Sequence, residues 1–222
     1  IYGPGVTQLF PDGHVANLYP YEYNEVPVLM AAALRGPWPI VALHLTRPGV
    51  EIPDREALGM GHYFEAAKGA YILRDYTADQ PKGGCIFVQG TTSTANVVKL
   101  LPELDAKGLN VKIVATPSPE LFKAQPKEYQ DSIVTKADRW DSTFITNCGR
   151  RLMRDWVFNP LADRYAMVPD WDDQWRTGGQ LGEVIEEAHL DEASLLAGIE
   201  RFVNERDQRL AELREGVDAI EG

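Results

Sequence analysis

Two short segments hold side chains whose types and spacing could do chemistry. Gly90-Thr-Thr-Ser-Thr94 follows a short apolar run and opens a stretch of helical periodicity, so its amides and hydroxyls could hold an anion at a helix start. The segment matches neither of the common glycine-rich phosphate-binding patterns, and we favour hydroxyl capping of an ordinary helix, both here and at Ser118. The acidic residues 170–173 could attract a divalent cation, but a metal site needs converging ligands, so we expect a solvated acidic loop.

The histidines and cysteines are scattered along the chain. His44 lies inside an apolar run, which favours a hydrogen-bonded, buried histidine over a general base or a metal ligand. For His62, in a segment rich in proline and glycine, approach to an active site is an alternative that we do not favour. Cys85 and Cys148 belong to no CxxC or Cys/His cluster, so we expect two small core residues of a cytoplasmic protein.

Composition limits the classes of partner. The chain has 222 residues, of which 44% are hydrophobic and 25% charged, as in ordinary globular proteins. Its net charge of −11 disfavours nucleic acid and anionic membranes as partners, and no apolar run has the length of a membrane span. The first residues include neither an initiator Met nor a signal-peptide pattern, so we expect that the chain was cut from something longer.

The periodicity of apolar residues predicts alternating strands and helices. Strands are expected at residues 15–18, 39–45, 69–76, 85–89, 111–116, 142–146 and 165–168. Helices are expected at residues 24–34, 90–107, 150–157 and 180–188, and after Ser118 and Asp191, with a frayed or solvent-exposed helix beyond Asn204. We therefore predict an α/β fold with a three-layer arrangement, in which helices cover both faces of a mostly parallel sheet, preceded by a partial α/β unit.

Several segments, in order, resemble the end of the transketolases. Residues 19–25 are similar to the Arg-Pro-Ala-Asp-x-Asn-Glu segment of that family, residues 42–47 to its strand ending in Leu-Ser/Thr-Arg, and residues 69–75 to its Gly-Gly-Tyr-Val-Leu-Lys-Asp strand. Residues 111–134 match the family's Met-Pro-Ser-x-x-x-Phe-x-x-Gln-x-x-x-Tyr-x-x-Ser-Val-Leu run at six spaced positions. The resemblance implies the end of the pyrimidine-binding domain and a linker at residues 1–55, and the transketolase C-terminal domain at residues 56–222.

The resemblance also implies a function for the whole assembly. Transketolases use thiamine diphosphate and a divalent metal (Mg²⁺ or Ca²⁺) to move two-carbon ketol units between sugar phosphates. The family's Gly-Asp-Gly…Asn motif and its cofactor-activating glutamate are absent here, and belong to sequence upstream of Ile1. We therefore expect no catalytic residue, bound cofactor or activity on this chain alone, and a mainly structural, dimer-supporting role. The expected partners are the rest of the transketolase, as upstream domains or a separate subunit, a second copy in a homodimer, and a sugar phosphate.

The resemblance places the family's phosphate-binding arginine at Arg47. An arginine at the end of a strand can hold a phosphate by bidentate, charge-assisted hydrogen bonds, and the alternative is a structural ion pair near a domain seam. The match is poor over residues 136–174, and residues 175–179 replace the family's Phe-Gly-x-Ser/Ala-x-Pro turn. Two other interpretations stay open: a fragment like the homodimeric pyruvate dehydrogenase first component, or a non-catalytic regulatory or interaction subunit.

Overall fold

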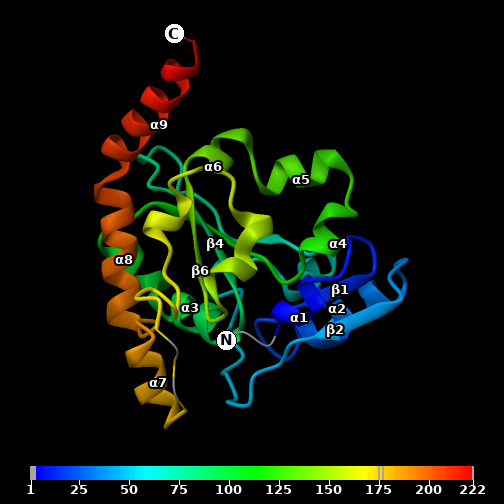
Figure 1. Ribbon diagram of the computed structural model, residues 1–222. Coiled ribbons are helices and arrows are strands. Elements are labelled where there is room, and N and C mark those ends of the chain that lie inside the picture. Colours follow the sequence, from blue (N-terminus) through cyan, green and yellow to red (C-terminus); the bar gives the residue numbers. More distant parts are fainter. Residues whose placement is uncertain (1–3, 175, 177, 222) are drawn as a thin grey trace.

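The computed structural model describes residues 4–174, 176 and 178–221 (Figure 1). Trp175 and Thr177, in the turn where the sequence departs from the family pattern, lie outside the described residues. The described strands form a two-stranded sheet and a four-stranded sheet. No helix of the described residues is both long and apolar enough to cross a membrane.

The predicted strands and helices are present in order except for the strand at residues 165–168, and five short helices, at residues 5–8, 63–68, 127–133, 136–140 and 162–165, were not predicted. The strands are β1 (Val15–Leu18), β2 (Ile40–Leu43), β3 (Tyr71–Arg74), β4 (Gly84–Gln89), β5 (Val111–Ala115) and β6 (Ser142–Thr146). The α-helices are α1 (Gly5–Gln8), α2 (Glu25–Leu34), α3 (Thr91–Ala106), α4 (Pro119–Lys123), α5 (Lys127–Ile133), α6 (Lys136–Trp140), α7 (Leu181–Glu187), α8 (Glu192–Asn204) and α9 (Arg206–Glu221). Three 3-10 helices, η1 (Tyr63–Lys68), η2 (Arg150–Trp156) and η3 (Ala162–Tyr165), complete the set.

The larger sheet confirms the predicted α/β class. Its order is β3-β5-β4-β6, with β4 paired in parallel to both β5 and β6, and β3 antiparallel at one edge. Helix α3 connects β4 to β5 and ends before Gly108, whose φ of +66° suits a glycine. The sheet is therefore mostly parallel, with β4 at its centre.

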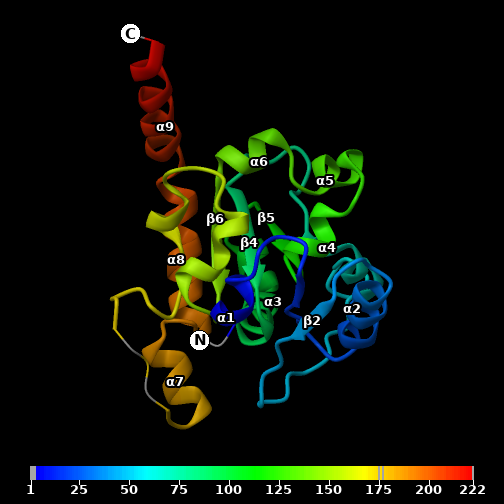
Figure 2. The ribbon, with the colours of Figure 1, turned by 45° about the vertical axis from the view of Figure 1, so that its right-hand side comes forward.

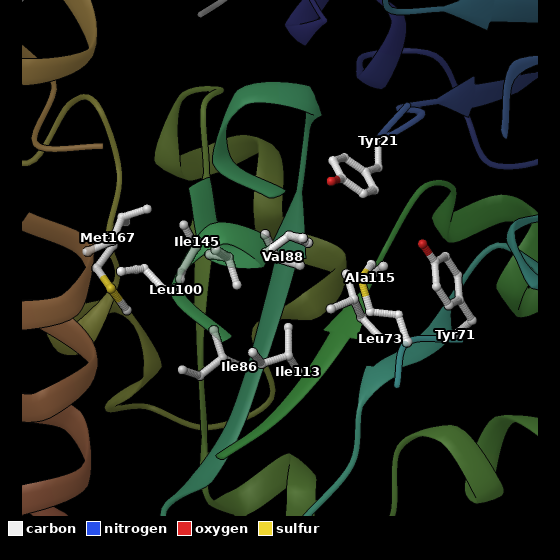
Figure 3. Packing of buried hydrophobic residues seen from close by; sticks show 14 of the residues in the cluster. Tyr21, Tyr71, Leu73, Ile86, Val88, Leu100, Ile113, Ala115, Ile145 and Met167 are labelled. Atoms are coloured by element: carbon white, nitrogen blue, oxygen red, sulfur yellow. The ribbon is translucent and has the colours of Figure 1, made fainter. Parts of the chain in front are cut away.

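Helices cover both faces of this sheet because successive strand residues point to opposite sides. On one face, Ile86 and Val88 of β4 belong to the same buried cluster as residues of α3 and α8 (Figure 3). On the other face, Phe87 lies 5.7 Å, ring centre to ring centre, from Trp156 of η2, and Trp156 lies 5.4 Å from Phe122 of α4. The predicted layering of helix, sheet and helix is present.

The N-terminal unit consists of β1, α2 and β2, and its two strands pair in parallel. The prediction of a buried strand over residues 39–45 is wrong in part: β2 covers only Ile40–Leu43, and Ile40 is 42% exposed. The reason is that β2 has a described partner strand, β1, on one side only. Strand β1 is buried throughout, and its Leu18 joins the same cluster as Leu73 of β3, so the apolar core continues between the two sheets.

Two further expectations need correction. Residues 165–168 do not form a strand, because pairing stops after the single bridge between Ile145 and Met167, and Pro169, which has no N–H, follows directly after Val168. The helix expected at residues 150–157 is present as the 3-10 helix η2, which ends at Trp156. The charged tail is α9, which extends beyond the body of the molecule (Figure 2). The helix is exposed over residues 214–220, as expected, but near its beginning Arg209 is fully buried and bonded to Asp141 at 2.6 Å.

Candidate functional site

The residue that the resemblance singles out, Arg47, lies in a bend after the carboxyl end of β2. It is exposed, and none of the ion pairs among the described residues includes it. A free guanidinium at the end of a parallel strand is suited to bind an anion.

A pocket of about 260 Å³ opens beside this bend. Thr46 and Pro48, the two neighbours of Arg47, belong to its lining, whereas Arg47 itself does not. The other lining residues are mostly apolar or aromatic. They come from the segment between β1 and α2, the start of α2, the segment after β2 and the start of α3: Pro20, Tyr21, Glu22, Tyr23, Val26, Pro27, Leu45, Val50 and Thr91. The pocket therefore places an apolar surface, with one buried carboxylate at Glu22, at the carboxyl ends of the two parallel strands.

That carboxylate belongs to a buried ionic network that the sequence did not reveal. Arg55 Nη2 donates to Glu22 Oε1 at 3.0 Å and to Glu25 Oε1 at 2.8 Å. Arg55 Nη1 donates to the Tyr71 hydroxyl at 3.1 Å and to the Gly61 carbonyl at 2.8 Å. The network thus connects the start of α2, the segment after β2 and strand β3.

Two buried carboxylates share one guanidinium in this network, and the backbone supplies further hydrogen bonds. Tyr21 N donates to Glu25 Oε2 at 2.7 Å, and Asn24 N donates to Glu22 Oε2 at 2.6 Å. Burial raises the pKa of Glu25 above its ordinary value, although the hydrogen bonds from Tyr71, Tyr21 and Arg55 oppose the shift. With all four carboxylate oxygens bonded inside the protein, Glu22 and Glu25 are engaged in structure rather than free for a substrate.

A second polar cluster surrounds His44, directly after β2. The His44 ring stacks on Tyr19 with 4.6 Å between ring centres, and its Nε2 lies 3.2 Å from Asn17 Oδ1. The Asn17 amide group donates to Glu120 Oε1 at 2.9 Å, so Asn17 Oδ1 is the acceptor and His44 Nε2 carries the proton. Burial lowers the pKa of His44, which therefore stays neutral at neutral pH. The expectation of a hydrogen-bonded histidine is confirmed, in a half-buried setting.

The helix start at Gly90 differs from the expected capped turn. No side chain caps α3: Thr91 Oγ1 donates to the Pro20 carbonyl at 2.9 Å, and Ser93 Oγ donates to the Gln89 carbonyl at 2.6 Å. The hydroxyls fail to cap because they satisfy nearby carbonyls instead. At Ser118 the prediction is confirmed, since its side chain accepts from Leu121 N at 3.3 Å.

The remaining candidates have structural partners. His62 Nδ1 accepts from Phe64 N at the start of η1, and both Asp170 carboxylate oxygens accept from Arg150 N. Cys85 and Cys148 are buried and free. Among residues 4–174, 176 and 178–221 no group of three or more His, Cys, Asp or Glu side chains could hold a metal ion.

The sequence contains little that would predict the buried network of Arg55. Glu22 and Glu25 stand three positions apart before a helix, a spacing that indicates helix-start carboxylates and says nothing of an arginine partner. Arg55 lies in a segment of turns, where an arginine is ordinarily solvated. Only the three-dimensional arrangement shows that this segment is fixed to α2 and β3.

Comparison with known proteins relates the chain to one family. No protein-family model matches the chain. It is 29% identical over 118 residues to a transketolase of Geobacillus stearothermophilus, a match that covers 53% of this chain and 17% of that protein. It is also 29% identical over 93 residues to transketolase 1 of Pasteurella multocida, over 42% of this chain and 14% of that protein. The matches thus span less than one fifth of the length of these curated relatives.

Solved structures share the fold over most of the chain. A transketolase from Leishmania mexicana superposes with a TM-score of 0.67 and 17% identity, covering 91% of this chain and 27% of that one. A split-gene transketolase, described as an inactive β4 tetramer, superposes with a TM-score of 0.59 and 13% identity, over 93% of this chain and 63% of that one. The chain therefore has an α/β fold that it shares with part of the transketolase structures. The predicted resemblance of the chain to the transketolases is confirmed.

Proposed function

We propose that this chain forms the C-terminal part of a thiamine-diphosphate-dependent, transketolase-like enzyme that transfers two-carbon ketol units between sugar phosphates. The supporting observation is that curated transketolases match the sequence while transketolase structures match the fold over 91% of the chain. We assign residues 1–55 to the end of the pyrimidine-binding domain and its linker, and residues 56–222 to the C-terminal domain. The two free, buried cysteines fit a cytoplasmic protein.

The described residues do not fit the cofactor's metal and diphosphate. They gather no three side chains of the types that ligate a metal, and the Gly-Asp-Gly…Asn pattern is absent from the sequence. We therefore assign thiamine diphosphate and its divalent metal to polypeptide outside this chain. The proposed role of this chain is to bind and orient the substrate through its phosphate and to support the assembly, which we propose to be dimeric.

Within this assembly, Arg47 is the proposed contact of the substrate's phosphate. Its exposed guanidinium, outside every ion pair of the described residues, can donate two parallel hydrogen bonds to a phosphate dianion. The neighbouring pocket offers mostly apolar walls, since Glu22 is bonded to Arg55 and Asn24. Arg47 would then anchor the charged end of the substrate at the carboxyl ends of β1 and β2.

An Arg47→Gln variant of the complete enzyme tests this role. A charge-assisted hydrogen bond contributes about 1.5–3 kcal/mol, so we expect KM for a phosphorylated acceptor to rise roughly ten- to a hundredfold. KM for an unphosphorylated aldose should change little. Arg214→Gln, an exposed arginine on α9, is the matched control. Equal effects of Arg47→Gln on both substrates would contradict the phosphate contact.

A further inference from the structure

A pocket of about 290 Å³, which we call the β1 pocket, opens beside the first strand. Val15 and Asn17, whose side chains leave β1 on the same side, form part of its wall. The other walls come from the segment before β1, from Trp38, from α4, which packs against β1, and from the end of η2 (Figure 1). Among the described residues, none lines both this pocket and the pocket beside Arg47. The β1 pocket is therefore a separate place on the molecule.

A carboxylate without a counter-ion lines the β1 pocket. Glu120 Oε2 accepts hydrogen bonds from Asn17 N at 3.0 Å and from Ser118 Oγ at 3.4 Å, whereas Oε1 accepts one, from Asn17 Nδ2 at 2.9 Å. Each oxygen of an ionised carboxylate has two lone pairs that can accept. No ion pair among the described residues includes Glu120. Its charge is therefore uncompensated there, and Oε1 can accept a further hydrogen bond.

Two aromatic side chains line the same pocket. Phe10 is 45% exposed, and Trp38 is half-buried against the apolar core. The indole of Trp38 lies so close to Gly36 that any side chain at Gly36 would overlap it, and this close packing limits where the ring can lie. The faces of aromatic rings attract cations. Aromatic walls near an uncompensated carboxylate favour an organic cation with an apolar part.

The cations of the β1 pocket are opposed by carboxylates at its mouth. Lys123 Nζ lies 2.6 Å from Asp155 Oδ1. Lys123, Arg154, Asp155 and Asp12 also line a second, more open pocket of about 580 Å³, whereas Glu120 lines the β1 pocket alone. The mouth therefore holds two cations and two carboxylates, and Glu120 adds a third carboxylate at the inner end. This balance disfavours an anion as the ligand.

We infer that the β1 pocket binds a small primary ammonium compound with a short apolar body. The ammonium group donates to Glu120 Oε1, and the apolar body lies against Phe10 and Trp38. A primary ammonium fits better than a quaternary one, because only an N–H group can donate to a carboxylate oxygen. Such a group is charged at neutral pH, since the pKa of an alkyl ammonium is about 10. The inference does not depend on the proposed ketol transfer or on Arg47.

Titration of the 222-residue chain, followed in amide NMR spectra at pH 7, tests the inference. The probe is n-butylamine, which is protonated at this pH. Its matched compounds are n-butanol, of the same length without the charge, and butyrate, of the opposite charge. We expect saturable shifts at Asn17, Trp38 and Glu120 with n-butylamine, and binding of n-butanol that is about ten- to a hundredfold weaker, because the charge-assisted hydrogen bond is lost. Butyrate should cause no shifts at these residues.

Two substitutions separate the contacts. Glu120→Gln should weaken n-butylamine binding about ten- to a hundredfold. Glu128→Gln is the matched control and should leave binding unchanged, because Glu128 is exposed on α5 and outside the ion pairs of the described residues, and its substitution changes the net charge equally. Phe10→Leu keeps an apolar wall without the ring, and should weaken binding about two- to fivefold through loss of one exposed cation–π contact.

Several outcomes would overturn the inference: no saturable shifts with n-butylamine, equal binding of n-butanol, preferential binding of butyrate, or equal effects of the two glutamate substitutions. Glu120→Gln also removes a hydrogen-bond partner of Asn17, so its folding is checked by the dispersion of the amide spectrum. If that variant does not fold, the comparison of n-butylamine with n-butanol on the unsubstituted chain and the effect of Phe10→Leu decide the question. Unchanged binding by Phe10→Leu would contradict the proposed place of the apolar body.

Discussion

The Tyr71 hydroxyl donates a hydrogen bond of 2.5 Å to Glu25 Oε1, joining residues that are 46 positions apart. Tyr71 lies on β3 of the larger sheet, and Glu25 is the first residue of α2 in the N-terminal unit. Burial raises the pKa of Tyr71, and the negative charge of Glu25 raises it further, so the hydroxyl keeps its proton and stays a donor. This bond, together with the hydrogen bonds of Arg55, fixes the N-terminal unit to the larger sheet.

Removing that hydroxyl tests the connection. Tyr71→Phe leaves the ring in place and takes away one donor to a buried carboxylate, so we expect a loss of about 1–3 kcal/mol in the free energy of unfolding. Urea unfolding at neutral pH measures it. Tyr23→Phe is the control, because Tyr23 is exposed and its hydroxyl takes part in no hydrogen bond among the described residues. A Tyr71→Phe protein as stable as the control would show that the bond does not contribute.

The buried pair of Lys112 and Asp138 predicts a dependence of stability on pH. Lys112 Nζ lies 2.9 Å from Asp138 Oδ2, and Thr135 N donates to the same oxygen at 3.0 Å. Burial opposes the charged form of Asp138. The hydrogen bonds from Lys112 and Thr135, together with the positive charge of Lys112, nevertheless lower the pKa of Asp138 below its ordinary value of 3.8. A lowered pKa in the folded state gives stability that is present above pH 3.8 and is lost as the pH falls through the folded-state pKa.

Asp138→Asn measures this contribution. At pH 7 we expect a loss of about 3 kcal/mol in unfolding free energy, because the substitution leaves Lys112 buried without its counter-ion. Urea unfolding from pH 7 to pH 3 should show that the difference in unfolding free energy between the wild-type and Asp138→Asn proteins becomes smaller at the acid end. A difference that stays constant over the whole range would contradict the assignment.

The elements that follow ordinary periodicity were predictable, and those fixed by distant partners were not. The predicted strand, helix and strand at residues 85–89, 90–107 and 111–116 correspond to β4, α3 and β5, because local apolar spacing determines each of them. The failed strand at residues 165–168 has a suitable apolar composition, but pairing stops before Pro169. Burial of Arg209 in the charged tail depends on Asp141, which is 68 positions away and gives no local signal.

The candidate site shows the same division. Arg47 could be identified only from the resemblance to the transketolases. No sequence pattern predicted the buried network around Arg55. The pocket beside Arg47 combines residues from the segments that follow β1 and β2 and from the starts of α2 and α3. These parts of the chain meet only because the N-terminal unit packs against the larger sheet. The apolar character of the pocket could not be predicted, because the sequence does not indicate that Glu22 is paired with Arg55.

Close backbone packing predicts a large cost for a small substitution at Gly69. A Cβ there would lie 2.2 Å from Phe122 N and 2.3 Å from the Ser118 carbonyl oxygen, and φ is +84°. Gly69→Ala should therefore lower the free energy of unfolding by about 3 kcal/mol or more, because the added Cβ overpacks the site and the backbone there is left-handed. Gly59→Ala is the matched control, since Gly59 has φ of +62° and open space around it. Thermal unfolding of both variants checks the prediction, and equal losses would contradict it.

The attachment of α9 depends on one buried arginine. Arg209 Nη2 donates to Asp141 Oδ1 and Nη1 to the Phe202 carbonyl, each at 2.6 Å. Arg209→Met leaves Asp141 with Arg206 alone and should lower the free energy of unfolding by about 3 kcal/mol. Arg214→Met, five residues further along the helix and exposed, should leave it nearly unchanged. Hydrogen exchange would show faster exchange in α9 for Arg209→Met only, and unchanged exchange would contradict the role of this residue.

The central claim is that this chain works as the C-terminal part of a transketolase-like enzyme. The most direct test is to isolate the native assembly with an antibody raised against this chain, determine the intact masses it contains, and assay ketol transfer between sugar phosphates with thiamine diphosphate and Mg²⁺. We predict additional polypeptide beyond the 24.8 kDa of this chain, and transfer activity that depends on the cofactor. A homogeneous 24.8 kDa species that lacks ketol transfer would contradict the claim.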